Sequence, residues 1–166
     1  WADERIEAGK KVCIYTDNTE VFKEIMEHYG NRARGINGQT SSPAKRLDYV
    51  NAFQHDPNVV VFVGNIIAAG ESITLTAASQ LAFCDINRVP GEITQTEDRI
   101  NRGGARETSD IYYFVALGTQ DERVMADFVQ SNEVVRTVTA RRDEFGNIHD
   151  APWTGPIEKY RNWGKV

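Results

Sequence analysis

The sequence has few of the residues that build metal sites and disulfides. It contains two cysteines and three histidines in 166 residues, and His28, His55 and His149 are scattered without the short ligand spacings of a zinc site. No metal site is therefore expected. Cys13 and Cys84 each lie in an apolar run, which predicts two buried free thiols in a reducing compartment rather than a disulfide.

Long apolar runs and an excess of positive charge are also missing. No apolar stretch approaches the roughly 20 residues of a membrane-spanning helix, and no signal-peptide pattern opens the chain. We therefore expect no membrane contact and an intracellular location, with nucleus, nucleoid and infected-cell cytoplasm left open. The formal net charge of −5 argues against strong autonomous binding of nucleic acid, although it leaves room for a local basic strip on an acidic body. The opening Trp1-Ala2-Asp3-Glu4 indicates a segment excised from a longer protein.

A phosphate-binding loop of the form Gly-x-x-x-x-Gly-Lys-Ser/Thr is absent from the sequence. The segment Ala8-Gly9-Lys10-Lys11 has neither the spacing nor the hydroxyl. No acidic magnesium-binding box follows a predicted strand, since Asp121-Glu122 opens a predicted helix instead. The sequence therefore predicts that this chain, taken alone, does not hydrolyse ATP.

Apolar strand-like runs alternate with helical patterns along most of the chain. Strands are expected at 12–15, 34–37, 59–63, 81–85 (which ends in an acid) and 111–116. Helices are expected after Asp17-Asn18-Thr19, from Ser42-Pro43 to about residue 55, and from the capping boxes at 94–97 and 119–122. This alternation predicts an α/β domain with an open, mainly parallel sheet and helices on both faces.

The helical patterns also predict which side chains are buried. The first of these helices presents Phe22, Ile25, Met26 and Tyr29 on one face, and the second is expected to bury Leu47, Val50 and Phe53. We assign residues 1–140 to this domain and 141–166 to a C-terminal extension, because the periodicity stops at Arg141. The aromatic residues of the extension are Trp153, Tyr160 and Trp163, and we expect them to dock on a protein surface.

The most informative pattern lies between residues 95 and 102. Gln95, Arg99 and Arg102 stand at i, i+4 and i+7, so on a helix they share one face. Guanidinium groups make bidentate bonds to phosphate oxygens, and an arginine aimed at a transferring phosphoryl group stabilises the charge of the transition state. The pattern fits a polyphosphate ligand. A solvated helix face carrying Glu97 and Asp98 is the alternative interpretation, and spacing alone slightly favours it.

Two further loops are rich in small and polar residues. One covers residues 65–76, directly after the buried strand at 59–63, and it offers the hydroxyls of Thr74 and Thr76. The other covers residues 37–42 and leads into a helix that carries Lys45 and Arg46 in its first turn. Each loop suits contacts to phosphate groups, but taken alone the first is no more than a common kind of α/β loop, and the second is better explained as an ordinary capped helix start.

Taken together and in order, these segments resemble the C-terminal helicase lobe of superfamily 2, the second RecA-like domain, and above all that of Swi/Snf-type and annealing-helicase-like proteins. The matching positions are Gly38-Gln39-Thr40-Ser41, Arg46, Phe53-Gln54, 68–79, Pro90, Gln95-x-Glu97-Asp98-Arg99-x-x-Arg102 and Gly118-Thr119-x-Asp121-Glu122. The chain departs from the family at Ser72, where a glycine is usual, at Gly64-Asn65, and at Gly103-Gly104-Ala105.

The resemblance implies roles for the matched residues. Arg99 and Arg102 would be arginine fingers, and Gln95, Gly70 and Glu71 would lie close to the nucleotide. Contacts to the nucleic-acid backbone would come from Thr40, Ser41, Asn65 and Thr74, with Lys45 beside them. ATP and Mg²⁺ would be bound mainly by the N-terminal RecA-like lobe, and duplex DNA is the expected substrate.

Three functions follow from the resemblance. The first is the second motor lobe of an ATP-dependent DNA translocase or helicase. The second is the lobe of an unwinding RNA or DNA helicase from another superfamily 2 branch. The third, suggested by the departures at Ser72 and Gly103-Gly104-Ala105, is a non-catalytic binding module that retains the lobe fold.

Overall fold

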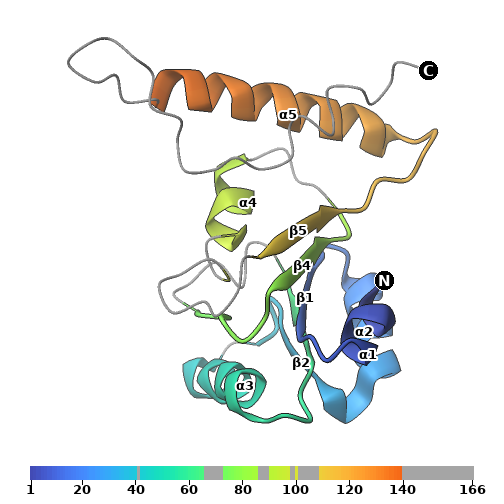
Figure 1. Cartoon of the computed structure of the whole chain (residues 1–166), viewed down its shortest axis with the longest axis vertical. Coiled ribbons are helices and arrows are strands. Elements are labelled where there is room, and N and C mark those ends of the chain that lie inside the picture. The colour runs from blue at the N-terminus through green and yellow to red at the C-terminus, as the bar shows by residue number, and fades with distance from the viewer. Residues whose placement is uncertain (41, 66–72, 86–89, 98–99, 101–108, 140–166) are drawn as a thin grey trace.

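The computed structural model describes residues 1–40, 42–65, 73–85, 90–97, 100 and 109–139. Its centre is a five-stranded sheet in the order β2-β3-β1-β4-β5, and every adjacent pair is parallel (Figure 1). The strands are β1 (Val12–Tyr15), β2 (Ala33–Ile36), β3 (Val61–Gly64), β4 (Gln80–Phe83) and β5 (Asp110–Tyr113). All five expected strands form, with ends that differ from the expected ones by at most three residues.

The central strands are buried on both faces, which is why they are apolar without interruption. In β1, Val12 and Ile14 belong to one core cluster, and Cys13 and Tyr15 belong to the other. This division follows from the alternation of side chains along a strand.

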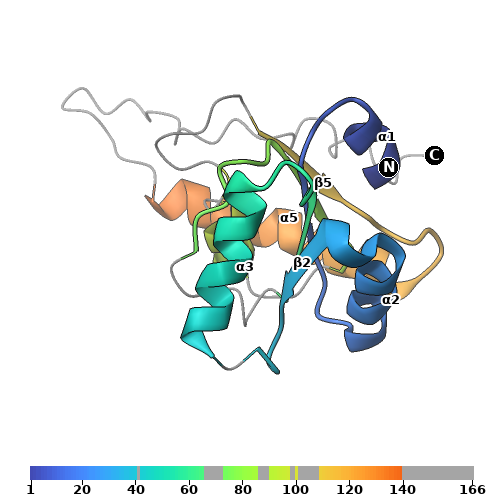
Figure 2. The ribbon, with the colours of Figure 1, turned by 90° about the horizontal axis from the view of Figure 1, so that it is seen from below.

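Helices cover both faces of the sheet, as expected (Figures 1 and 2). Side chains of α1 and α2 pack on the first cluster, and side chains of α3, α4 and α5 belong to the second. The helices are α1 (Ala2–Glu7), α2 (Thr19–Tyr29), the short 3-10 helix η1 (Gly30–Arg32), α3 (Pro43–His55), α4 (Pro90–Glu97) and α5 (Gln120–Thr139). In the part of the chain that the structure describes, no helix is long and apolar enough to cross a bilayer.

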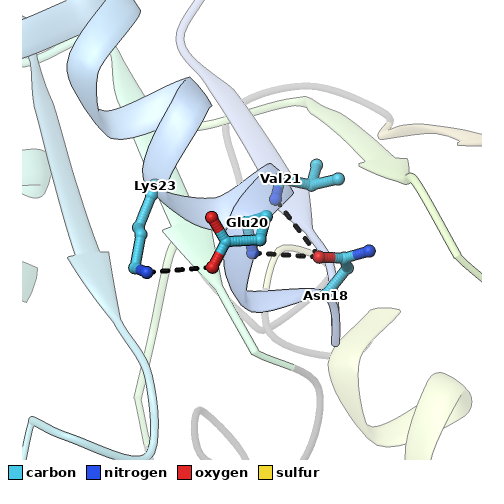
Figure 3. Close-up of polar contacts among 4 residues, drawn as sticks. All are labelled: Asn18, Glu20, Val21 and Lys23. Atoms are coloured by element: carbon cyan, nitrogen blue, oxygen red, sulfur yellow. Dashed lines mark hydrogen bonds and ion pairs between the residues drawn. The ribbon is translucent and has the colours of Figure 1, made fainter.

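The start of α2 follows the predicted capping pattern. The Asn18 side-chain oxygen accepts hydrogen bonds from the amides of Glu20 at 2.9 Å and Val21 at 3.3 Å, and Lys23 pairs with Glu20 at 2.9 Å (Figure 3). The two amides belong to the helix N-terminus, where backbone donors have no partner within the helix. The predicted apolar face of α2 packs on the sheet.

Close packing of α2 on β2 depends on a glycine. A Cβ atom built at Gly35 would lie 2.6 Å from Cζ of Phe22 and 2.8 Å from Sδ of Met26. Such distances are well below ordinary van der Waals contact. Gly35 therefore allows two large side chains of α2 to lie directly against the strand.

Helix α3 begins as predicted but buries less than predicted. Ser42 is its N-cap and Pro43 its first residue, a position that tolerates proline because no intrahelical partner is lost there. Val50 and Phe53 are buried, whereas Leu47 is 60% exposed. The prediction for Leu47 was wrong because it lies beyond the edge of the face that α3 turns toward the sheet.

The two predicted capping boxes have different outcomes. At α5, Thr119 Oγ1 accepts a hydrogen bond from the amide of Asp121 at 3.2 Å, so the predicted helix start is confirmed. At α4 the prediction was wrong, because the helix begins at Pro90 and Thr94 lies inside it. Glu97 does not cap the helix start; its carboxylate accepts a hydrogen bond from the hydroxyl of Tyr113, in a site only 5% exposed.

Candidate functional site

Polar residues follow four of the five strands at the point where each strand ends. Thr16 and Asp17 come after β1, Asn37 after β2, Asn65 after β3, and Asp85 two residues after β4. Because all the strands are parallel, their carboxyl ends meet at one edge of the sheet. This edge carries most of the described candidate residues.

The edge is held together at its centre by Asp85. Its carboxylate accepts hydrogen bonds from the Thr16 hydroxyl, at 2.7 and 2.9 Å to the two oxygens, and from the amide of Asp17 at 2.7 Å. Thr16 is 1% exposed. Strands β1 and β4 are neighbours, yet the helices that follow them, α2 and α4, lie on opposite faces of the sheet. Open α/β sheets bind ligands at such a reversal.

Sequence reasoning did not select Asp85 or Thr16 as functional residues. The only local signal was that an apolar strand ended in an acid. The partners of Asp85 lie 68 and 69 residues earlier in the chain, so only the fold brings them together.

The turn after β2 is built by the side chain of Asn37. Its Oδ1 accepts hydrogen bonds from the amide of Gln39 at 3.0 Å and the hydroxyl of Thr40 at 3.2 Å. The Thr40 carbonyl accepts a bond from Nε of Arg46 at 2.6 Å, which fixes the turn to α3. Thr40 is half-buried, and Lys45 is exposed with its ammonium 5.5 Å from the ring centre of Tyr49. Ser41 lies outside the described residues.

The segment after β3 is fixed at both of its described ends. The amide of Asn65 donates to the carbonyl of Ile36 at 3.0 Å, which joins the ends of β3 and β2. Farther along, the carbonyl of Thr74 accepts a hydrogen bond from the side-chain amide of Gln54 at 2.8 Å. Thr74 and Asn65 are both half-buried. Gly70, Glu71 and Ser72 lie outside the described residues.

Gln95 is exposed on α4, whose buried side includes Ile93, Thr96 and Glu97. Arg99 and Arg102 lie outside the described residues, as do Gly103-Gly104-Ala105. The expected shared helical face of Gln95, Arg99 and Arg102 therefore falls largely outside the described residues and stays a prediction.

The two cysteines are free, as predicted, with Cys13 buried and Cys84 partly buried. Burial raises the pKa of the Cys13 thiol far above its ordinary value. Burial, and secondly the nearby Asp85 carboxylate, raise the pKa of Cys84 to about 11. Both thiols are therefore protonated at neutral pH and are poor nucleophiles. Within the described ranges, no three His, Cys, Asp or Glu residues gather in a way that could hold a metal ion.

Comparison with curated proteins finds relatives over most of the chain. The chain is 36% identical over 140 residues to the SWI/SNF-related matrix-associated actin-dependent regulator of chromatin subfamily A-like protein 1 homolog of Caenorhabditis elegans, covering 82% of the chain and 20% of the relative. It is 35% identical over 116 residues to the DNA annealing helicase and endonuclease ZRANB3 of Mus musculus, covering 69% of the chain and 11% of the relative.

A third relative is the chromatin-remodeling ATPase INO80 of Drosophila melanogaster, 31% identical over 133 residues. That match covers 78% of the chain and 8% of the relative. The chain thus spans a fifth or less of the length of each of these three proteins. No protein-family model matches the chain.

Among solved structures, the fold is similar to the C-terminal part of the Fun30 ATPase domain. The TM-score is 0.67 at 19% sequence identity, and the match covers 74% of this chain and 40% of the other. The parallel sheet with helices on both faces is the RecA-like fold expected from the sequence. By sequence relationship and fold, the chain belongs to the C-terminal helicase lobes of the Swi/Snf type, within superfamily 2.

Proposed function

We propose that this chain is the second motor lobe of an ATP-dependent DNA translocase or annealing helicase. The observation that carries the proposal is the gathering of polar groups from β1, β2, β3 and β4 at one edge of the sheet. The names of the relatives support the same function, since they include a DNA annealing helicase and a chromatin-remodeling ATPase. The free thiols fit a reducing compartment inside the cell.

The nucleotide would be shared with an N-terminal RecA-like lobe that holds most of ATP and Mg²⁺. Bound ATP supplies the phosphoryl group that passes to water. Donors from this chain suit phosphate oxygens better than a metal, because Gln95 offers an exposed amide and Arg99 and Arg102 offer guanidinium groups. We assign the arginine-finger role to Arg99 and Arg102. Gly70 and Glu71 complete the proposed nucleotide contacts.

The nucleic acid would be duplex DNA, contacted through its phosphates. Thr40 and Thr74 lie in segments that α3 fixes, Asn65 follows β3 directly, and Lys45 is exposed at the start of α3. With Ser41, these residues offer hydroxyl, amide and ammonium donors, which suit phosphate oxygens. Phosphate contacts position a protein without reading sequence, so binding would tolerate any sequence and weaken with salt.

The test joins this chain to a phosphate-binding helicase lobe and measures phosphate release with and without duplex. The wild-type pair should turn over ATP and respond to DNA. Arg102→Ala should lower turnover by about three orders of magnitude or more, as loss of an arginine finger does, while DNA binding falls less. Arg123→Ala, on the exposed side of α5, is the control and should change little.

Three outcomes separate the candidate functions. Turnover of Arg102→Ala within about threefold of wild type would remove the finger assignment. Strand separation in place of duplex translocation would favour an unwinding helicase. DNA binding without turnover in the joined wild type would favour a non-catalytic module, the reading suggested by Ser72 and Gly103-Gly104-Ala105.

A further inference from the structure

Helix α3 is attached to two separate loops by one side chain near each of its ends. Near its start, Nε of Arg46 donates to the carbonyl of Thr40 at 2.6 Å. Near its end, the side-chain amide of Gln54 contacts the segment 74–77. The two loops follow different strands, β2 and β3, and they carry the two threonines to which we assign phosphate contacts.

Gln54 fixes its segment through both halves of the amide. Its Nε2 donates a hydrogen bond to the carbonyl of Thr74 at 2.8 Å and lies 3.4 Å from the hydroxyl of Thr76. Its Oε1 accepts a hydrogen bond from the amide of Ala77 at 2.8 Å. The side chain thus satisfies a backbone acceptor and a backbone donor three residues apart, where the segment has no strand partner. Backbone groups that are partly shielded from water, as here, need such partners.

The helix between these two anchors is itself held firmly. Phe53, next to Gln54, is fully buried and packs with its ring centre 5.5 Å from that of Phe62 in β3. On the other side of the contact, Leu75 and Ala78 are 0% and 3% exposed. Arg46 and Gln54 are about 12 Å apart along the helix axis, given the rise per residue.

We propose that α3 is a rigid spacer that sets the separation between the two phosphate-contacting loops, with Arg46 and Gln54 as its positioning residues. The proposal rests on the proposed function, because it takes Thr40 and Thr74 to contact the DNA backbone. Neither Arg46 Nε nor the Gln54 amide needs to reach DNA in this role. Their effect on binding passes through the backbone of residues 40 and 74–77.

The experiment measures binding of the 166-residue chain to a mixed-sequence duplex at low salt. Gln54→Glu removes the side-chain N–H that donates to the Thr74 carbonyl and keeps an oxygen that can accept from the Ala77 amide. Asn51→Asp, on the exposed side of the same helix, adds the same charge without touching the segment. Gln54→Glu should weaken binding by about 3- to 10-fold more than Asn51→Asp, the loss expected for one phosphate hydrogen bond.

A double-mutant cycle shows whether Gln54 acts through Thr74. If both changes remove the same contact, Gln54→Glu and Thr74→Val together should cost little more than either alone. Additive losses, or equal affinity of Gln54→Glu and Asn51→Asp, would overturn the proposal. If Gln54→Glu does not fold, Arg46→Lys takes its place, with Arg32→Lys on η1 as the control. Equal affinity of those two variants would also overturn it.

Amide hydrogen exchange tests the positioning role of Gln54 independently of whether the chain binds DNA. The Ala77 amide should exchange faster in Gln54→Ala than in wild type, because its acceptor is gone. If the wild type binds no duplex at low salt, the DNA-contact role fails and the exchange result alone decides whether Gln54 positions the segment. An unchanged exchange rate at Ala77 would exclude positioning by Gln54, whatever the chain binds.

Discussion

The Asp85 carboxylate, just after β4, accepts a hydrogen bond from the hydroxyl of the buried Thr16, just after β1. The same carboxylate accepts a hydrogen bond from the backbone amide of Asp17, the residue immediately before Asn18, which caps α2. One side chain therefore connects two neighbouring strand ends at the reversal of the sheet. The helices that follow these two strands, α2 and α4, pack on opposite faces of the sheet, so the bond lies between the two strands at which the covered face changes.

We predict that Asp85→Asn destabilises the fold by about 1–3 kcal/mol, because an amide nitrogen would replace one of two acceptor oxygens among several donors. Urea denaturation monitored by circular dichroism measures the change. Asp127→Asn, on the exposed side of α5, should lie within about 0.5 kcal/mol of wild type. Equal midpoints for the two variants would show that the Asp85 connection contributes nothing to stability.

Two apolar residues of α3 should respond very differently to truncation. Phe53 is fully buried between α3 and β3, whereas Leu47 is 60% exposed. We predict that Phe53→Ala costs about 3–5 kcal/mol of the free energy of unfolding, since it leaves a cavity in the core. Leu47→Ala should cost less than about 0.5 kcal/mol. A large loss for Leu47→Ala would mean that another part of the protein covers that residue.

Stability should fall in alkali through the thiol of Cys84. Its folded pKa of about 11 lies above the ordinary value of 9.0, so the folded state favours the protonated thiol. This contribution is fully present below about pH 9 and is lost as the pH rises through 11. The urea midpoint of wild type should therefore fall more steeply between pH 9 and 11 than that of Cys84→Ser. Parallel pH profiles would contradict the raised pKa.

Much of the fold could be predicted because local patterns and tertiary needs agree in the central elements. The apolar run at 59–63 predicted a buried parallel strand, and β3 is buried along its whole length. Asn18, Ser42 and Thr119 were each predicted at a helix start and are found there. In each case the side chain that marks the boundary bonds within a few residues, so the signal is local.

Two of the failures, at Glu97 and Asp85, share a physical cause: a residue in a local pattern bonds to a partner far away in the sequence. Thr94-x-x-Glu97 has the form of a capping box, but Glu97 is bonded to Tyr113 on β5 and the helix starts at Pro90. Asp85 bonds to residues that precede it by more than sixty positions. Of the candidate site residues, Thr40, Lys45, Asn65, Thr74 and Gln95 fall within the described residues, and their proposed contacts stay predictions.

The isolated chain should fold, hydrolyse no ATP and bind duplex DNA weakly. Folding follows from a sheet buried on both faces and covered by helices. Inactivity follows because arginine fingers only complete a site whose phosphate loop, lysine and magnesium carboxylates come from elsewhere, and the sequence has no such loop. Weak binding follows from the net charge of −5 and from few phosphate contacts, which leave the dissociation constant at roughly 10⁻⁴ to 10⁻⁶ M at physiological salt.

Phosphate release by the purified chain, with and without duplex, tests this prediction. The expected result is no steady turnover in either case, and turnover that DNA stimulates once a phosphate-binding lobe is joined. Trace contamination is controlled with Arg99→Ala, since a contaminating ATPase would be unaffected by a change in this chain. Steady turnover of the wild-type chain that disappears in Arg99→Ala would show that the chain holds a complete ATPase site, and the assignment as one half of a motor would be wrong.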